Sequence, residues 1–249
     1  MTDQPGAADE IMNGVYRALC THGYAGLTMQ DIADECSKSK SLLHYHYDTK
    51  EDLLVAFLGR VISGFERRVT EAAGDSPAER LVAFVGWFVF EPADTDRESF
   101  HIALLELRSQ GPFNGRIREQ LRRSDRLLRG TVAEILADGI DAGVFRDVDV
   151  DETAALLVAT LDGARTRQIT LGTGLSGGST DDEPDPADDL DVVYTRTVAE
   201  ATLRRIVDPL LAADATLPSL AETLEDLPAR TGQNPTATGS DEDPQPPGE

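Results

Sequence analysis

The chain has 249 residues and a formal net charge of −22, because 45 Asp and Glu outnumber 23 Lys and Arg; its length permits one or two domains with a sizeable core. The polar, acidic residues 1–10 do not form a signal peptide, and the most apolar run, residues 81–90, is too short to span a bilayer. Cys20 and Cys36 fall at apolar positions, which indicates buried free thiols and a soluble cytoplasmic protein rather than a disulfide framework.

Acidic and basic residues differ in their distribution along the chain as well as in number. Acids occur along the whole chain, whereas lysine occurs only at Lys38, Lys40 and Lys50. This composition favours a protein from a halophilic, salt-accumulating organism over an ordinary acidic protein. At ~1 M salt the Debye length is about 3 Å, so distant acids hardly repel an anionic partner such as DNA.

The first expected elements are a helix, a cap and a second helix. Residues 1–8 are expected to be disordered, and residues 9–22 to form a helix that Gly23 ends. Arg17 on this helix is expected to be a solvated surface charge. Thr28 is suited to cap the next helix, in which apolar residues recur at helical spacing: Met29, Ile32, Ala33 and Cys36.

A tight turn and a third short helix follow. The apolar run breaks at Ser37 and Lys38, and Ser39 can cap a helix whose inner face is Leu42, Leu43 and Tyr47. Acids then open the next helix, where the helix dipole favours them. Two short helices joined by a tight turn are typical of a helix-turn-helix, whose second helix enters the major groove of DNA. The three lysines lie in the same stretch, as a phosphate-facing surface requires.

An ordered set of residues between positions 11 and 58 matches a family pattern: Gly23, Tyr24, Leu27, Thr28, Ile32, Ala33, Ser39, Lys40, Leu43, Tyr45, His46, Tyr47, Lys50, Glu51, Asp52, Leu53 and Leu54. On these residues the stretch resembles the N-terminal domain of TetR-type transcriptional regulators. Three positions depart from the family: Ser37 replaces the usual Gly, Lys38 an apolar residue, and His44 a Tyr. The first two put the turn geometry and a core contact in question, and the third prevents any transfer of operator preference.

Candidate DNA contacts follow from side-chain chemistry. The three lysines are candidates for phosphate contacts, and Thr28 and Thr49 lie at helix N-termini, where backbone N–H groups also meet phosphates. Candidates for base edges or thymine methyl groups are Gln30, Ser39, Ser41, His44 and Tyr45. The resemblance implies a phosphate contact for His46, and the turn residue Ser37 completes the set.

The two histidines of this stretch have a structural alternative. His44 and His46 are two residues apart on a helix, so they are expected to point to opposite faces and cannot both face DNA equally. Packing within the domain is therefore the alternative for each. The same geometry disfavours a zinc site built from these histidines and Cys36.

The rest of the chain is expected to contain only helices and loops. Helices are expected over residues 49–73, 78–90, 96–109, 113–142, 151–171, 192–213 and 219–227, and mobile or disordered segments over residues 172–191 and 230–249. The fold class is therefore all-α with about nine helices. A helix-turn-helix head over residues 9–60 precedes an effector-binding and dimerisation domain over residues 61–213. Residues 214–249 form an acidic, mostly disordered tail.

Two charged patterns outside the head have simple explanations. We interpret six closely spaced arginines as a solvated helix face paired with acids, rather than as a site for nucleic acid or an anionic ligand. They are Arg116, Arg118, Arg122, Arg123, Arg126 and Arg129. Asp147, Asp149 and Asp151 begin like a calcium loop, but its sixth and twelfth positions are Glu152 and Val158. Acids at a helix start explain this run. No metal and no cofactor is expected.

The resemblance also implies how the second domain works. Helices 151–171 and 192–213 would pair with their copies in a homodimer, which predicts a palindromic operator in double-stranded DNA. A small apolar or amphipathic effector would bind in this domain. Its candidate contacts, for most of which plain core is the alternative, are Phe84, Trp87, Phe88, Phe100, His101, Glu106, Arg108 and Phe113.

These expectations lead to a ligand-responsive DNA-binding regulator, most simply a repressor that the effector releases from DNA. The alternative is a helical dimeric adaptor that has lost specific DNA binding and acts through protein partners. An enzyme is not expected, because the sequence contains no Gly-rich phosphate loop, no nucleophile elbow and no metal-ligand cluster of correct spacing. No association with a membrane is expected.

Overall fold

The computed structural model describes residues 7–71, 76–89, 95–171 and 194–226. These residues form ten α-helices and no strand, which confirms the all-α class. None of the helices in this part of the chain is long and apolar enough to cross a membrane. The helices are α1 (Ala7–Gly26), α2 (Met29–Glu35), α3 (Lys40–His46), α4 (Lys50–Glu71), α5 (Pro77–Gly86), α6 (Thr95–Ser109), α7 (Gly115–Asp141), α8 (Val150–Leu171), α10 (Tyr194–Thr202) and α11 (Leu220–Asp226).

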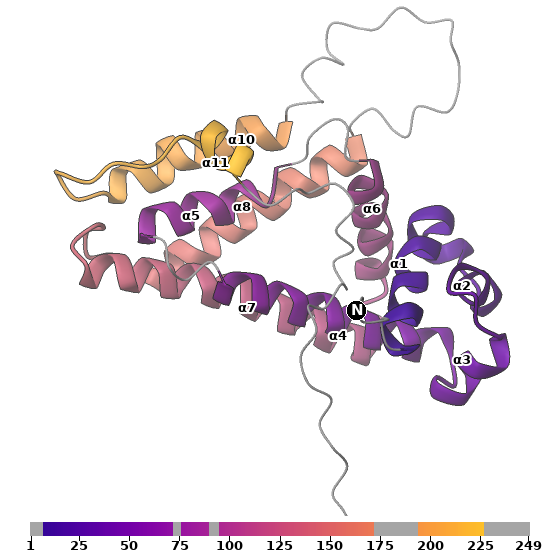
Figure 1. Ribbon diagram of the computed structural model, residues 1–249. Helices are drawn as coiled ribbons and strands as arrows, with labels where there is room; N and C mark the ends of the chain where they lie inside the picture. The colour runs from indigo at the N-terminus through magenta and orange to yellow at the C-terminus, as the bar shows by residue number, and fades with distance from the viewer. Residues whose placement is uncertain (1–6, 72–75, 90–94, 172–193, 227–249) are drawn as a thin grey trace, which may run out of the picture.

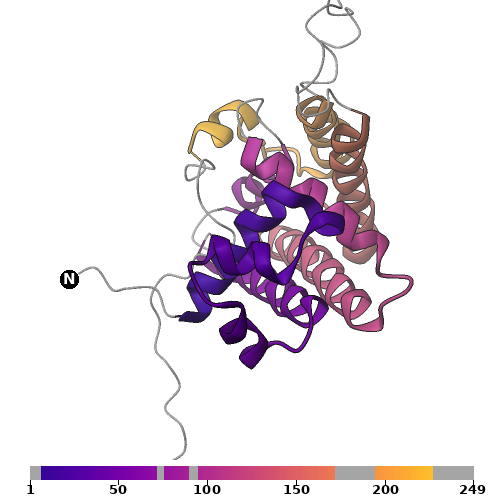
Figure 2. The same cartoon turned by 90° about the vertical axis from the view of Figure 1, so that its right-hand side faces the viewer.

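The helices separate into a head and a body (Figure 1). α1, α2 and α3 group at one end of the molecule, and α5, α10 and α11 lie toward the other end. α6 stands between the two groups and packs along α1, while α7 and α8 pack on each other in the body. Figure 2 looks onto the head and shows α3 at its outer edge. The predicted helix-turn-helix head on a helical bundle is thus present.

The short helices of the head begin at the capping residues expected from the sequence. Thr28 Oγ1 accepts from the Asp31 N–H at 3.3 Å, and the Asp31 carboxylate accepts from the Thr28 N–H at 2.8 Å. Ser39 Oγ accepts from the Leu42 N–H at 3.2 Å at the start of α3. Each such cap stabilises a helix by ~1 kcal/mol, which matters for helices of only seven residues.

Caps also set the start of two body helices. Ser76 caps α5, with Pro77 at its first position, as predicted. At the start of α8, Asp149 Oδ1 accepts from the Glu152 N–H at 2.9 Å. Asp149 of the acidic run thus caps α8, and Asp151 lies in the first turn of that helix. No group of three or more His, Cys, Asp or Glu side chains in the described residues is arranged to hold a metal ion.

Two predicted helices end earlier than expected. The helix predicted over residues 78–90 ends at Gly86, and the chain then continues in i→i+3 turns, with Val89 N–H donating to the Gly86 carbonyl at 3.1 Å. The prediction of one helix over residues 192–213 is wrong in its second half. α10 passes into a π-helical segment, Leu203–Val207, and then a 3₁₀ turn, Asp208–Leu210.

Pro209 explains the end of this last helix. Its nitrogen has no hydrogen to donate to the preceding turn, so the α-helical ladder cannot continue through it. The chain leaves the helix and pairs with the α7–α8 connection. There the Ala212 N–H donates to the Val144 carbonyl at 2.9 Å, and the Arg146 N–H donates to the Leu210 carbonyl at 2.7 Å.

The buried side chains form two hydrophobic cores. The first belongs to the head, but it also contains Phe100, Ala103 and Leu107 of α6 and Ile117 of α7. The second belongs to the body and is built from α5, α7, α8, α10 and the segment after α10. α4 spans both cores, because Phe57 lies in the first and Phe65 packs against the second. Movement of α6 or α4 therefore reaches the head directly.

The packed body extends beyond residue 213, where the predicted tail begins. α11 packs on α5, and Leu220 is buried in the second core. The mobile or disordered segments predicted over residues 172–191 and 230–249, and most of residues 1–8, lie outside the described residues.

Candidate nucleic-acid interface

α3 presents almost all of its side chains to solvent. Leu43 is its only fully buried residue, whereas its remaining polar and aromatic side chains are exposed: Lys40, Ser41, His44, Tyr45 and His46. Tyr45 is 82% exposed, and its ring lies edge-on to the His46 ring at 5.1 Å. Since a seven-residue helix anchored through one face leaves the other positions free, both histidines are exposed. The packing alternative therefore does not hold for either.

Gln30 and Thr28 lie on the adjacent surface of α2. Both are exposed, but their polar groups already have partners within the helix. The Gln30 amide donates to Asp34 at 2.7 Å, and both the N–H and the hydroxyl of Thr28 donate to Asp31. The hydrogen bonds from the Thr28 hydroxyl and then from the Thr28 N–H lower the pKa of the Asp31 carboxyl, so it remains charged at this helix N-terminus.

The turn between α2 and α3 keeps a standard helix-ending geometry although it contains no glycine. Ser37 adopts a left-handed conformation with φ of 53°, and its N–H donates to the Asp34 carbonyl at 3.4 Å. The Lys38 N–H donates to the Ala33 carbonyl at 3.1 Å. This is a Schellman turn with serine in the position that glycine usually occupies. Lys38 occupies the position of the usual apolar contact, and its ammonium forms an ion pair with Glu10.

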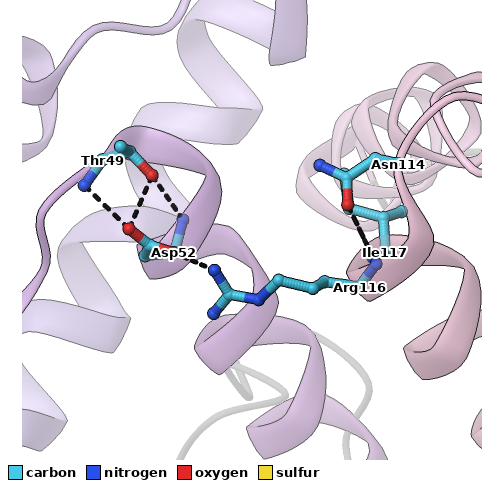
Figure 3. A network of polar contacts seen from close by, with 5 residues as sticks. All are labelled: Thr49, Asp52, Asn114, Arg116 and Ile117. Carbon is cyan, nitrogen blue, oxygen red and sulfur yellow. Dashed lines mark hydrogen bonds and ion pairs between the residues drawn. The ribbon is translucent and has the colours of Figure 1, made fainter.

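The start of α4 is capped by its own acid and tied to the body (Figure 3). The Thr49 N–H and hydroxyl donate to Asp52 at 3.0 and 2.7 Å. Arg116, at the start of α7, forms an ion pair with the other oxygen of Asp52. Hydrogen bonds from Thr49 and then from Arg116 lower the pKa of the Asp52 carboxyl.

The three lysines occupy different environments. Lys40 is exposed on α3, whereas Lys38 is paired with Glu10. The Lys50 ammonium donates to the carbonyls of Tyr24 and Leu27, at 3.2 and 3.0 Å, and lies 4.7 Å from the centre of the Tyr24 ring. Of these three lysines, only Lys40 presents its ammonium without a partner among the described residues.

Comparison with known proteins identifies the protein family of this chain. The family "Bacterial regulatory proteins, tetR family" matches residues 11–57, and "BetI-type transcriptional repressor, C-terminal" matches residues 77–179. The crystal structure of a TetR transcription regulator from Haloarcula marismortui is 34% identical in sequence, covering 83% of this chain and 98% of that one, with a TM-score of 0.69. The chain belongs to the TetR family.

Two further relatives are also described as transcriptional regulators. The transcriptional repressor AcnR of Corynebacterium diphtheriae is 28% identical over 174 residues, which cover 69% of this chain and 83% of AcnR. A Saccharomonospora viridis chain assigned as a transcriptional regulator, solved in complex with choline, is 28% identical. That match covers 80% of this chain and 96% of that one, with a TM-score of 0.61. The TetR-family chain described above is accordingly a DNA-binding transcriptional regulator, and the relatives are regulators rather than enzymes.

The structure does not bring the predicted effector contacts of this TetR-family protein into one site. Phe84, Trp87 and Phe88 lie together with Phe65 at the second core, with Phe65 and Trp87 ring centres 5.1 Å apart. Phe100 belongs instead to the first core and is followed by the half-buried His101. Phe113 is 87% exposed in the turn before α7. Phe100, His101 and Phe113 are therefore separated from the aromatic group of the body.

Two further candidates, Glu106 and Arg108, connect parts of the protein. Glu106 Oε2 accepts from the N–H groups of Tyr24 and Ala25 at 2.5 and 3.2 Å, which ties α6 to the end of α1. Arg108 pairs with Asp162 of α8 at 2.9 Å. α6 is thus linked by charged groups to the head on one side and to α8 on the other.

The sequence reasoning missed several polar contacts that shape the TetR-family head. Arg17 is exposed, as expected, and it also donates to Glu35 at 3.0 Å. Arg116 points toward α4, whereas on the outer face Arg126 and Arg129 pair with acids of α7 itself. These three arginines are solvated and paired with acids, as expected, but the partner of Arg116 lies on another helix. A pairing between distant helices leaves no local sequence signal, so only the fold reveals it.

Proposed function

We propose that the protein is a homodimeric cytoplasmic repressor that binds a palindromic operator through α3 and is released by a small apolar or amphipathic effector. The observation that carries this proposal is the outer surface of α3. In a chain of net charge −22, this helix exposes Lys40, Ser41, His44 and Tyr45 without a facing acid on the helix itself. Side chains of these types contact phosphates and base edges in the major groove.

The dimer is proposed from an uncovered face of α8. Leu156 is 52% exposed, Ala159 is exposed, and a Cβ on Gly163 would meet nothing within 4 Å. These residues are spaced three and four apart, so they line one side of the helix. Small residues there let a second helix approach closely, and α10 packs beside α8. A copy of α8 and α10 would complete a four-helix interface with two-fold symmetry.

The effector is proposed to act on the aromatic group of the body, Phe65, Phe84, Trp87 and Phe88. The guanidinium of Arg165 lies 4.1 Å from the centre of the Phe88 ring and donates to the Trp87 carbonyl at 3.2 Å. An apolar body with a polar end fits such surroundings. Choline, which the Saccharomonospora viridis relative holds, is one compound to test, because aromatic rings attract quaternary ammonium groups.

Release from DNA is proposed to pass through α6 as well as α4. α6 is tied to the end of α1 by Glu106 and to α8 by Arg108. An effector that binds more tightly to a geometry in which the two heads are misplaced would shift the protein toward that geometry. The charged links on α6 give such a shift a direct path from the dimer helix to the head.

Selection of bound sequences from random DNA tests this proposal. The purified protein is used in high potassium salt, with a Lys40→Ala/His44→Ala variant as the control. The proposal expects a palindromic motif that the variant fails to enrich. Enrichment of no sequence at any salt concentration contradicts it, and would favour the alternative of an adaptor that works through protein partners.

A further inference from the structure

Charged side chains on one face of α1 contact the turn between α2 and α3. Glu10 and Arg17 are seven residues apart, so they lie on the same side of the helix. Glu10 forms an ion pair with Lys38, just before α3. Arg17 donates to the Glu35 carboxylate at 3.0 Å, and also to the Glu35 backbone carbonyl at the end of α2. The two pairs therefore hold the turn at both of its ends.

Gly14 lies between these two residues on the same face of α1. A Cβ on Gly14 would be 2.6 Å from the Cβ of Cys36 and 3.0 Å from its backbone nitrogen. Real Cβ atoms do not approach other atoms so closely, and only a residue without a side chain allows α1 to sit this near the turn. The middle of the turn thus rests directly on the α1 backbone.

The turn needs such support because its own residues do not favour its conformation. Ser37 has φ of 53°, a left-handed conformation that favours glycine. Lys38 takes the place of the apolar residue that commonly packs against the end of a helix at this point. The angle between α2 and α3 is therefore held by contacts with α1.

We propose that Glu10, Gly14 and Arg17 form an α1 clamp that sets the orientation of α3, and that Lys38 is a positioning residue held by Glu10 rather than a phosphate contact. The clamp rests on DNA binding through α3. It assigns a role in operator recognition to an acid, Glu10, that itself would repel phosphates.

The negative charge of Glu10 distinguishes the α1 clamp from a simple electrostatic effect on DNA affinity. Removal of an ordinary acid from a DNA-binding domain strengthens binding, because it removes repulsion of the phosphates. Removal of the clamp acid weakens binding, because α3 loses its fixed orientation. For Lys38, a phosphate contact contributes about 0.9 to the slope of log affinity against log salt concentration, whereas a positioning residue contributes nothing to that slope.

The test compares Glu10→Gln and Lys38→Met with two matched controls, Asp48→Asn for an exposed acid of the head and Lys40→Met for an exposed lysine of α3. Affinity for a duplex selected by the wild-type protein is measured at several KCl concentrations, after circular dichroism has established that each variant is folded. We expect Glu10→Gln and Lys38→Met each to weaken binding about fivefold with an unchanged salt slope. The double variant is expected to be no weaker than either single one. Asp48→Asn is expected to bind as well as the wild type or better. Lys40→Met is expected to lower the slope by about 0.9 for each head, which is about 1.8 for a dimer on its operator.

A second measurement does not depend on DNA. Amide hydrogen exchange at Ser37 and Lys38, whose N–H groups bond to α2 carbonyls, is expected to be faster in Glu10→Gln than in the wild type. The clamp is overturned if Glu10→Gln shows unchanged amide exchange and binds DNA as tightly as the wild type or more tightly. A lower salt slope for Lys38→Met would show that Lys38 is a phosphate contact. A wild-type protein that selects no sequence counts against the proposed function, and the exchange result then decides on the clamp.

Discussion

Arg116 of α7 and Asp52 of α4 form an ion pair that joins the body to the first turn of α4, the helix that follows α3 (Figure 3). Asp52 at the same time accepts the N–H and hydroxyl of Thr49, which begins that turn. The start of α4 is thus fixed from within its own helix and from the body. It lies one turn away from residues proposed to meet DNA.

These contacts predict how stability depends on pH. The pKa of Asp52 is lowered by Thr49 and Arg116, and that of Asp31 by Thr28. A carboxyl whose folded pKa lies below its unfolded value of about 3.9 stabilises the fold above that value, and loses this effect as pH falls through the folded pKa. We expect the free energy of unfolding, measured with urea, to be level above about pH 5.5 and to fall below about pH 4.

The matched variant for this prediction is Asp52→Asn. It keeps the size of the side chain but removes the charge, so the fall in stability below pH 4 should become shallower than in the wild type. Asp141→Asn, which removes an exposed acid at the end of α7, is the control and should leave the profile nearly unchanged. Identical pH profiles for Asp52→Asn and the wild type would show that the lowered pKa does not contribute to folding.

Glu106→Gln is expected to loosen the junction between α1 and α2. Its carboxylate accepts two backbone N–H groups, and hydrogen bonds to a charged acceptor are worth ~1.5–3 kcal/mol. We therefore expect amide exchange at Tyr24 and Ala25 to be about tenfold faster in the variant, while exchange in α8 stays the same. Equal exchange at both amides would mean that Glu106 does not hold the head.

The uncovered face of α8 predicts a monomeric variant. Gly163→Glu and Leu156→Glu place a charge where a partner helix would pack, so sedimentation should show dissociation of the dimer with the helical content unchanged. Gly130→Glu is the matched control, since Gly130 also has nothing within 4 Å of a Cβ but lies on α7. Dimers of unchanged stability in both α8 variants would move the interface elsewhere.

Lys40 and Lys50 are expected to differ although both lie in the predicted contact set. Lys50 donates to the carbonyls of Tyr24 and Leu27, so Lys50→Met should lower the free energy of unfolding by ~1–3 kcal/mol. Lys40 is exposed, so Lys40→Met should leave stability within ~0.5 kcal/mol of the wild type. Chemical denaturation of the two variants checks this, and equal losses of stability would contradict it.

Local signals in the sequence were sufficient for most of the fold. Capping residues such as Thr28, Ser39 and Ser76 act within a few residues, so they predict helix boundaries correctly. Gly23 breaks the helical conformation of α1 with φ of 62°, although α1 as assigned continues to Gly26. Pro209 is also a local signal, but the apolar spacing on both sides of it concealed the end of the last helix.

Contacts between distant helices could not be predicted in this way. The pairing of Glu10 with Lys38, or of Arg116 with Asp52, depends on how α1 and α7 pack on the head, and charge spacing along the chain carries no trace of it. The same limit explains why the predicted effector contacts were scattered. Aromatic residues such as Phe100 and Phe88 look alike in sequence, yet they fill different cores.

His44 tests most directly whether α3 reads the operator, as we propose. Sequences selected from random DNA are compared between the wild-type protein and His44→Asn, since Asn pairs with adenine through different atoms than histidine can offer. We expect a palindromic motif whose preferred base changes at one symmetric pair of positions. A motif that is identical for both proteins, or no motif for either, would contradict it.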